Sequence, residues 1–99
     1  MLEVTIFLDE DDMIKDESLY QYIMKYLLHH HIKGASIFSA VGGYGAKRHL
    51  HYPRTLGASS EGPMMILFID EEEKVREVLP PLKEVVAEGL IVLKKVERA

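Results

Sequence analysis

Basic residues, histidines and glycines, which bind anions and metal ions, gather in one part of this chain. From Ser18 to Ser60 the sequence has no Asp or Glu, although the whole protein carries a formal net charge of −4. All five histidines lie in this window. Its lysines and arginines are Lys25, Lys33, Lys47, Arg48 and Arg54. A basic segment in an acidic protein predicts binding of a small anionic ligand, against the alternative of a solvated loop whose charge matters little.

The glycine cluster in the second half of this window is the best candidate for the anion site. The predicted ligand-binding residues are Gly42, Gly43, Tyr44, Gly45, Lys47, Arg48, His51 and Arg54. Glycines expose the backbone amides and allow positive φ angles, so neighbouring N–H groups can form a concave nest for a phosphate or a carboxylate. No Gly-Lys-Ser/Thr follows, so the segment is not a Walker loop. Alternatively, the glycines only let a strand bend away from its sheet.

Metal binding is a weaker interpretation of the histidines. His49 and His51 lie two residues apart, so in extended backbone they share a face and could hold one ion together. In the alternative, one of them hydrogen-bonds a neighbouring subunit and the other is solvated. The run His29-His30-His31 has poor geometry, because consecutive helical residues point about 100° apart. We therefore predict no metal site and keep His49 and His51 as weak candidates.

The acidic residues form two runs outside this window. The run from Asp9 to Asp12 lacks the ligand spacing and the glycine of an EF-hand, and we interpret it as a solvated, mutually repelling turn. The run from Glu71 to Glu73 suits the N-terminus of a helix, where acids interact favourably with the helix dipole. Neither run predicts a cation site.

No motif in the chain indicates catalysis. There is no Cys, which excludes thiolate chemistry and disulfides, and no Ser stands in a nucleophile-elbow pattern. RNA binding is the rival hypothesis, because Tyr44, Tyr52 and the basic loop could contact bases and phosphates. The net charge of −4 and the absence of an RNP-type aromatic pattern oppose it. We expect a non-enzymatic protein that binds no nucleic acid.

Length and composition indicate one soluble domain covering residues 1–99. No apolar run approaches the roughly 18 residues that span a bilayer, and the N-terminus lacks a signal-peptide layout, so we expect a cytoplasmic protein. The chain has no Asn, a single Gln and abundant Glu and Lys. That composition is typical of proteins from thermophiles.

The first half of the chain predicts a strand, a helix and a second strand. Hydrophobic residues alternate from Leu2 to Leu8, which indicates a strand. The segment Ser18-Leu19-Tyr20-Gln21 fits a capping box that starts a helix, and Gly34 is a natural end for it. Residues 35–41 are strand-like. We predict a long functional loop over residues 44–62, mobile without its ligand and ordered with it.

The second half repeats this order. Met64 to Ile69 is apolar at every position, which predicts a strand buried on both faces. A second helix starts at Asp70, is kinked or divided at Pro80-Pro81, and ends at Gly89. Residues 90–96 form the last strand.

The element order is therefore βαββαβ, which predicts a ferredoxin-like α+β fold. In that fold two helices cover one face of a four-stranded antiparallel sheet. The chain has no further element to cover the other face of its apolar third strand. We therefore predict an obligate oligomer in which other copies of the chain cover that face.

Several segments, in order over nearly the whole chain, carry a family resemblance. They are Lys33-Gly-Ala-Ser-Ile-Phe-Ser-Ala-Val-Gly-Gly-Tyr-Gly-Ala46, Leu50-His51, Pro63, Phe68-Ile69-Asp70, and the ending from Leu79-Pro80 to Glu88-Gly89-Leu90-Ile91. Together they resemble the uncharacterised PII-like family called domain of unknown function 190. The resemblance implies a homotrimer whose sheets pack around a three-fold axis.

The resemblance also implies a function in signalling or regulation. PII proteins bind nucleotides or other small metabolites between subunits and contact a partner through a long loop after the second strand, which residues 44–62 resemble. An adenine nucleotide is thus the implied ligand, and no other cofactor is expected. Genes of the family often lie beside a fluoride-channel gene, which implies a membrane-transporter partner by association. The chain departs from PII proteins at 87–90, where it has no glycine-rich phosphate-binding turn.

Overall fold

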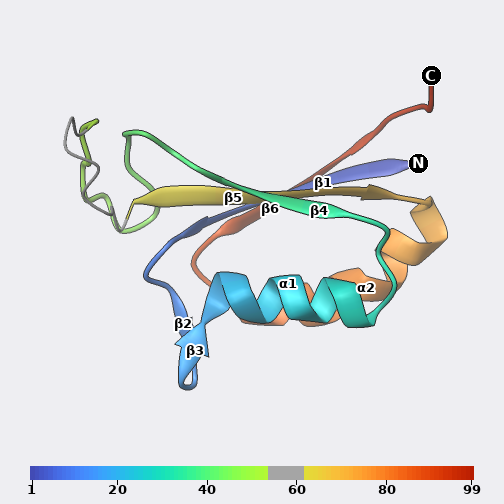
Figure 1. The fold of residues 1–99 in the computed structure, drawn as a ribbon, viewed down its shortest axis with the longest axis horizontal. Coiled ribbons are helices and arrows are strands. Elements are labelled where there is room, and N and C mark those ends of the chain that lie inside the picture. Colours follow the sequence, from blue (N-terminus) through green and yellow to red (C-terminus); the bar gives the residue numbers. More distant parts are fainter. Residues whose placement is uncertain (54–61) are drawn as a thin grey trace.

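The protein folds into one sheet with two helices beside it (Figure 1). The computed structural model describes residues 1–53 and 62–99. Its elements are β1 (Leu2–Asp9), β2 (Met13–Ile14), β3 (Glu17–Ser18), α1 (Leu19–His29), β4 (Ala35–Ser39), β5 (Pro63–Asp70), α2 (Glu72–Val85) and β6 (Leu90–Lys95). None of the helices in these two ranges is both long and apolar enough to span a bilayer.

The main sheet is antiparallel, with the strand order β4-β5-β1-β6. The central strand β1 pairs with both β5 and β6, so that Ile6 stands opposite Ile66 on one side and Ile91 on the other. Both helices lie on the same side of this sheet (Figure 1). The predicted ferredoxin-like α+β fold is confirmed. The short hairpin β2–β3 is an addition, since we expected residues 9–17 to form only a loop.

The hydrophobic core lies between the sheet and the helices. Alternate residues of β1 and β5 point into it, and the most deeply buried side chains include Val4, Ile6 and Ile66. The helices contribute Ile23, Leu27, Val75, Val78 and Leu82 to the same core. Each fully buried aliphatic side chain stabilises the fold by about 1.5–3 kcal/mol. This layer fixes the position of the central strand.

The opposite face of the sheet is open and largely apolar, with the ion-paired Glu3 and Lys94 at one end. Cross-strand partners share a face, so the register places there Phe7, Phe38, Met65, Leu67, Ile69, Leu90 and Val92. Among residues 1–53 and 62–99, no helix or strand covers them (Figure 1). The prediction that β5 is buried on both faces is wrong for the single chain, because its burial alternates and Ile69 is 38% exposed. In the single chain, one face of β5 therefore stays open.

The helix ends differ from the predicted ones. Helix α1 stops at His29, five residues before the predicted end at Gly34, and His31 just after it has a positive φ. This earlier turn lets Ile32 enter the core, where its side chain is buried. Ser18 starts α1 in extended conformation without a side-chain cap.

Helix α2 is continuous through Pro80 and Pro81, so the predicted division into two short helices is wrong. Both prolines are exposed, so the carbonyl groups that lose a helical donor face water, while Leu79 and Leu82 stay in the core. The helix ends at Val85 rather than at Gly89, because residues 86–89 form the turn into β6.

Asp70 connects three segments at the end of the fold remote from residues 42–53. It is 5% exposed; its carboxylate accepts hydrogen bonds from the backbone N–H groups of Lys33 at 3.1 Å and Glu71 at 2.8 Å. Burial alone would raise the pKa of Asp70, but these two donors, with the charges of Lys33 and Lys74, hold it below its ordinary value. The ionised form is therefore stabilised by folding.

We predict that Asp70→Asn destabilises the protein by about 1–3 kcal/mol near pH 7, because the amide loses the charge and one acceptor. Since the folded pKa is lowered, the contribution of Asp70 is present above the unfolded pKa of about 4 and disappears as pH falls through the folded value. Chemical denaturation of both proteins from pH 7 to pH 3 measures this. A constant difference over that range would contradict the assignment; Glu84→Gln, an exposed acid on α2, is the matched control.

Candidate functional site

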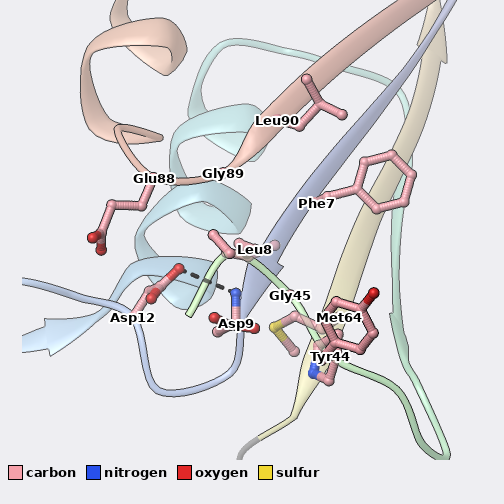
Figure 2. A pocket seen from close by; sticks show the side chains of 12 residues that line it. Phe7, Leu8, Asp9, Asp12, Tyr44, Gly45, Met64, Glu88, Gly89 and Leu90 are labelled. Atoms are coloured by element: carbon pink, nitrogen blue, oxygen red, sulfur yellow. Dashed lines mark hydrogen bonds between the residues drawn. The ribbon is translucent and has the colours of Figure 1, made fainter. Parts of the chain in front are cut away.

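A cleft of about 330 Å³ lies at the end of the sheet where β1 ends and β5 and β6 begin. Its wall combines strand ends with the glycine segment and the turn before β6 (Figure 2). The lining residues are Phe7, Leu8, Asp9, Asp12, Tyr44, Gly45, Ala46, Pro63, Met64, Glu88, Gly89 and Leu90. Phe7 and Leu90 also belong to the open sheet face, so the cleft is continuous with that face.

The glycine segment forms a small hairpin. Gly43 and His51 exchange two backbone hydrogen bonds of 2.8 Å, and Arg48 N–H donates to the Gly45 carbonyl at 2.9 Å. Gly43 has a φ of 129°, which only glycine adopts readily. The amides of Gly43 and Arg48 are therefore already used within the chain. Gly43 therefore shapes the loop, which agrees with the alternative that the glycines only let the chain bend away from the sheet. Tyr44 and Gly45, in contrast, face the cleft.

Two glycines permit close approaches at the cleft. A Cβ added to Gly45 would lie 2.7 Å from Asp9 Oδ1, and one added to Gly89 would collide with the carbonyl oxygen of Phe7. Gly45 thus brings the hairpin against the end of β1, and Gly89 brings the turn before β6 against the same strand. Gly89 is not among the predicted ligand-binding residues, although it is the only glycine after Gly62.

Lys47 contacts the acidic turn that follows β1. Its ammonium lies 3.0 Å from Asp12 Oδ1 and 3.1 Å from Asp11 Oδ1. These contacts, with Asp12 first, raise the pKa of Lys47. The window from Ser18 to Ser60 has no acid in the sequence, but in the folded protein Lys47 lies beside two acids from outside it. Its charge is paired with their carboxylates. The interpretation of residues 9–12 as a solvated turn is wrong for Asp9, which is buried, and Lys47 offsets part of the repulsion among the carboxylates.

Asp9 is the buried carboxylate of this site. It is 9% exposed, and its backbone N–H donates to Asp12 Oδ2 at 3.1 Å. Burial raises the pKa of Asp9, the neighbouring Asp12 and Asp11 charges add to the effect, and Lys47 opposes it only in part. Asp9 and Asp12 lie side by side at the edge of the cleft (Figure 2). Among the described residues, the lining of the cleft holds these two acids and Glu88, and no basic side chain.

The other predicted residues lie around the hairpin. The Arg48 guanidinium stands 6.0 Å from the centre of the Tyr44 ring and has no ion-pair partner among the described residues. His49 and His51 line a small recess together with Asp9, Asp11 and Lys47. Gly42 packs against the backbone of His51, where an added Cβ would lie 3.0 Å from its carbonyl oxygen. Arg54, and with it much of the predicted loop over 44–62, lies outside the described residues.

Comparison with known proteins identifies the family. Residues 1–98 match the family DUF190, described as "Uncharacterized ACR, COG1993". This chain belongs to the DUF190 family. It is 32% identical over 92 residues to a UPF0166 protein of Aquifex aeolicus, covering 93% of this chain and 87% of that protein. It is 35% identical over 89 residues to the UPF0166 protein MJ1524 of Methanocaldococcus jannaschii, covering 89% and 82%. The resemblance seen in the sequence is confirmed.

Solved structures place the DUF190 chain among PII-like folds. It is similar to CPII, a nitrogen regulatory PII-like protein from Thiomonas intermedia K12 bound to ADP, AMP and bicarbonate, with a TM-score of 0.68. The identity is 19%, over 99% of this chain and 93% of that chain. A structure of CPII bound to ADP and bicarbonate gives a TM-score of 0.59 at 20% identity, over 94% and 82%. At these identities the likeness concerns the fold.

We predict that Asp9→Asn makes the protein more stable near pH 7. The folded pKa of Asp9 is raised, so its favourable contribution is present below the unfolded pKa and is lost as pH rises through the folded value. A neutral amide avoids this loss, and the variant's advantage should disappear below about pH 4. Thermal unfolding across this pH range measures the difference. Asp16→Asn, an exposed acid between β2 and β3, is the control; a less stable Asp9→Asn at pH 7 would contradict the argument.

Proposed function

We propose that this protein is a non-enzymatic PII-like regulator that binds a small anionic ligand, foremost an adenine nucleotide, between the subunits of a homotrimer. One observation carries the proposal: the cleft at the end of the sheet is continuous with the open apolar face, through Phe7 and Leu90. A second copy that packs on this face would stand at the mouth of the cleft. The ligand site and the subunit boundary would then coincide.

The fold supports the regulatory part of the proposal. CPII is described as a nitrogen regulatory PII-like protein bound to ADP, AMP and bicarbonate, and this chain has the same fold. No catalytic motif accompanies the cleft in the sequence. We infer a cytoplasmic sensor that passes on ligand binding to a protein partner through the loop 44–62. A membrane transporter is the proposed partner, by the family association given above.

Apolar surface supports the oligomer. The seven open side chains of the sheet come from all four strands and form one face, which is larger than the scattered exposed hydrophobics of an ordinary monomer. A closed symmetric assembly buries such a face without leaving a copy of it exposed. Three-fold symmetry is the arrangement that the PII-like resemblance favours.

The contacts around the hairpin suggest roles for the ligand residues. Tyr44 borders the cleft with an exposed ring that can stack on a base. Arg48 stands beside Tyr44 and supplies the positive charge for a phosphate or carboxylate. Lys47 would serve the ligand only after leaving Asp11 and Asp12. The rest of the proposed set is Gly42, Gly43, Gly45, His51 and Arg54.

We predict that the protein is a trimer at low micromolar concentration and that Ile69→Glu reduces it toward the 11.3 kDa monomer. The charge would have to be buried under a second copy and beside Glu3, the cross-strand partner of Ile69, at a cost of several kcal/mol. Light scattering measures the mass. Leu28→Glu, an exposed position on α1, is the control and should stay trimeric. A monomeric wild type would refute both the oligomer and the placement of the cleft between subunits.

We predict that ADP or AMP raises the melting temperature of the wild type and that Arg48→Ala weakens this binding about tenfold or more. A charge-assisted hydrogen bond to phosphate contributes roughly 1.5–3 kcal/mol, which sets this magnitude. Calorimetric titration measures the dissociation constants, with Arg76→Ala on α2 as the matched control, since Arg76 pairs with Glu72.

The same thermal-shift panel separates the rival functions. A response only to Zn²⁺ or Cu²⁺ that is lost in His49→Ala or His51→Ala would favour a metal-binding trimer. A response only to RNA oligomers, with a steep dependence on salt, would favour an RNA-binding ferredoxin-like module. Either result without a nucleotide response would overturn the proposed ligand.

A further inference from the structure

The cleft at the end of the sheet has an acidic side and an apolar side. Figure 2 shows the acids Asp9, Asp12 and Glu88 toward one side and Phe7, Tyr44 and Leu90 toward the other. Among the described residues, no lysine, arginine or histidine joins this lining. A ligand in the cleft therefore meets apolar and aromatic groups on one side and negative charge on the other.

Two of these acids can accept hydrogen bonds from a ligand. Asp12 is used within the chain, because one of its oxygens accepts the Asp9 N–H at 3.1 Å and the other pairs with the Lys47 ammonium at 3.0 Å. No hydrogen bond or ion pair from the described residues reaches the carboxylate of Asp9 or Glu88. None of the described side chains has a buried oxygen without a partner, so the Asp9 oxygens keep contact with solvent. Asp9 and Glu88 therefore offer acceptors to a bound molecule.

Two cations of the glycine hairpin stand outside the lining of the cleft. Lys47 is held by Asp11 at 3.1 Å and by Asp12 at 3.0 Å. The Arg48 guanidinium stands beside the Tyr44 ring, 6.0 Å from its centre. A phosphate placed against the acids would be repelled by them, whereas a phosphate at the rim, beside Arg48, would meet an opposite charge. The charges of the site therefore orient a ligand that has one anionic end.

The nucleoside part of an adenine nucleotide matches the two sides of the cleft. Its base is a flat ring that can stack on Tyr44, and its ribose hydroxyls and amino group are hydrogen-bond donors for Asp9 and Glu88. An acidic residue that accepts a ribose hydroxyl is a recurrent feature of nucleotide sites. The cleft volume of about 330 Å³ lies near the lower end of the roughly 300–1,000 Å³ of ligand pockets. Such a volume suits the nucleoside with its phosphate directed outward.

We propose that the carboxylates of Asp9 and Glu88 bind the nucleoside end of the ligand and select against additional phosphates, so that this protein prefers AMP to ADP and ADP to ATP. The inference rests on the proposed function, because it takes an adenine nucleotide as the ligand of the cleft. Arg48 compensates part of the charge of the first phosphate at the rim. Each further phosphate adds negative charge near the acids, and no side chain in the described lining compensates it.

Calorimetric titration of the wild type with AMP, ADP and ATP, in low salt and without divalent ions, tests this order. We expect the dissociation constant to rise about fivefold with each added phosphate, because each brings one more negative charge near the carboxylates. The differences between the three nucleotides should shrink at about 1 M salt, where the Debye length falls to about 3 Å.

Glu88→Gln keeps the size of the side chain and removes its charge. Glu88 is exposed, so the variant should fold as the wild type does. The ratio of the ATP and AMP dissociation constants should fall about threefold. Glu73→Gln is the matched control, because it removes the same charge from an exposed acid in the first turn of α2, at the end of the fold remote from the cleft. The control should leave the ratio unchanged.

The dideoxy analogue of AMP, which lacks both ribose hydroxyls, tests the hydrogen bonds separately from the charge. It should bind about tenfold more weakly than AMP, because hydrogen bonds to charged acceptors are lost. Equal affinity of AMP and its dideoxy analogue would overturn the placement of the ribose against Asp9 and Glu88.

Titration with adenosine separates this inference from the proposed function. Adenosine binding without AMP or ADP binding would overturn the proposed anionic ligand and leave the charge selection standing. ATP binding as tight as AMP binding, or a ratio of the two constants that Glu88→Gln does not change, would overturn the selection and leave the nucleotide function standing. Absence of binding of all these compounds would overturn both.

Discussion

A sheet has two faces, and the two helices that the structure describes cover only one of them. The core between the sheet and the two helices is closed by residues such as Ile6, Ile66 and Val75, and it fixes the central strand β1. The other face keeps Phe7, Ile69 and their neighbours in contact with solvent. Successive side chains of a strand point to opposite faces of the sheet, so these residues cannot point into the core while their neighbours do. The open face therefore follows directly from the fold. The strand pattern thus explains why one side of the sheet carries exposed apolar side chains.

The same central strand positions the chemistry. Asp9 is the last residue of β1, and both the hairpin and the turn before β6 pack against this end of the strand through glycines that leave no room for a side chain. The cleft, the acidic turn and the edge of the open face therefore meet at one end of β1. Any movement of the hairpin relative to β1 changes the cleft and the Lys47 contacts together. Because the hairpin packs on the end of β1, the ion pairs of Lys47 and the shape of the cleft depend on the same contacts.

The fold could be predicted from the sequence because its signals are local. Alternation in residues 2–8 and the apolar run 64–69 marked the strands, and their order gave the topology. The ends of the elements were harder to predict: α1 ends before Gly34, and a positive φ at His31 lets Ile32 enter the core. The exposed prolines of α2 do not break it. In each case packing outweighed the preference of a single residue.

The site could be predicted only in part, because residues that are far apart in the sequence can become neighbours in the fold. The net charge of a sequence window therefore differs from the net charge around the folded site. Lys47 belongs to a window of more than forty residues without an acid, yet it lies within 3.1 Å of two aspartates that precede that window. The antiparallel pairing of β1 with β5 creates this contact, since it brings the end of β1 beside the start of β5 and the hairpin that folds next to it. A basic loop and an acidic turn that look like two separate features are thus one electrostatic unit. Its excess of carboxylates over ammonium groups distinguishes it from a plain anion site, and the fold places this excess on the wall of the cleft.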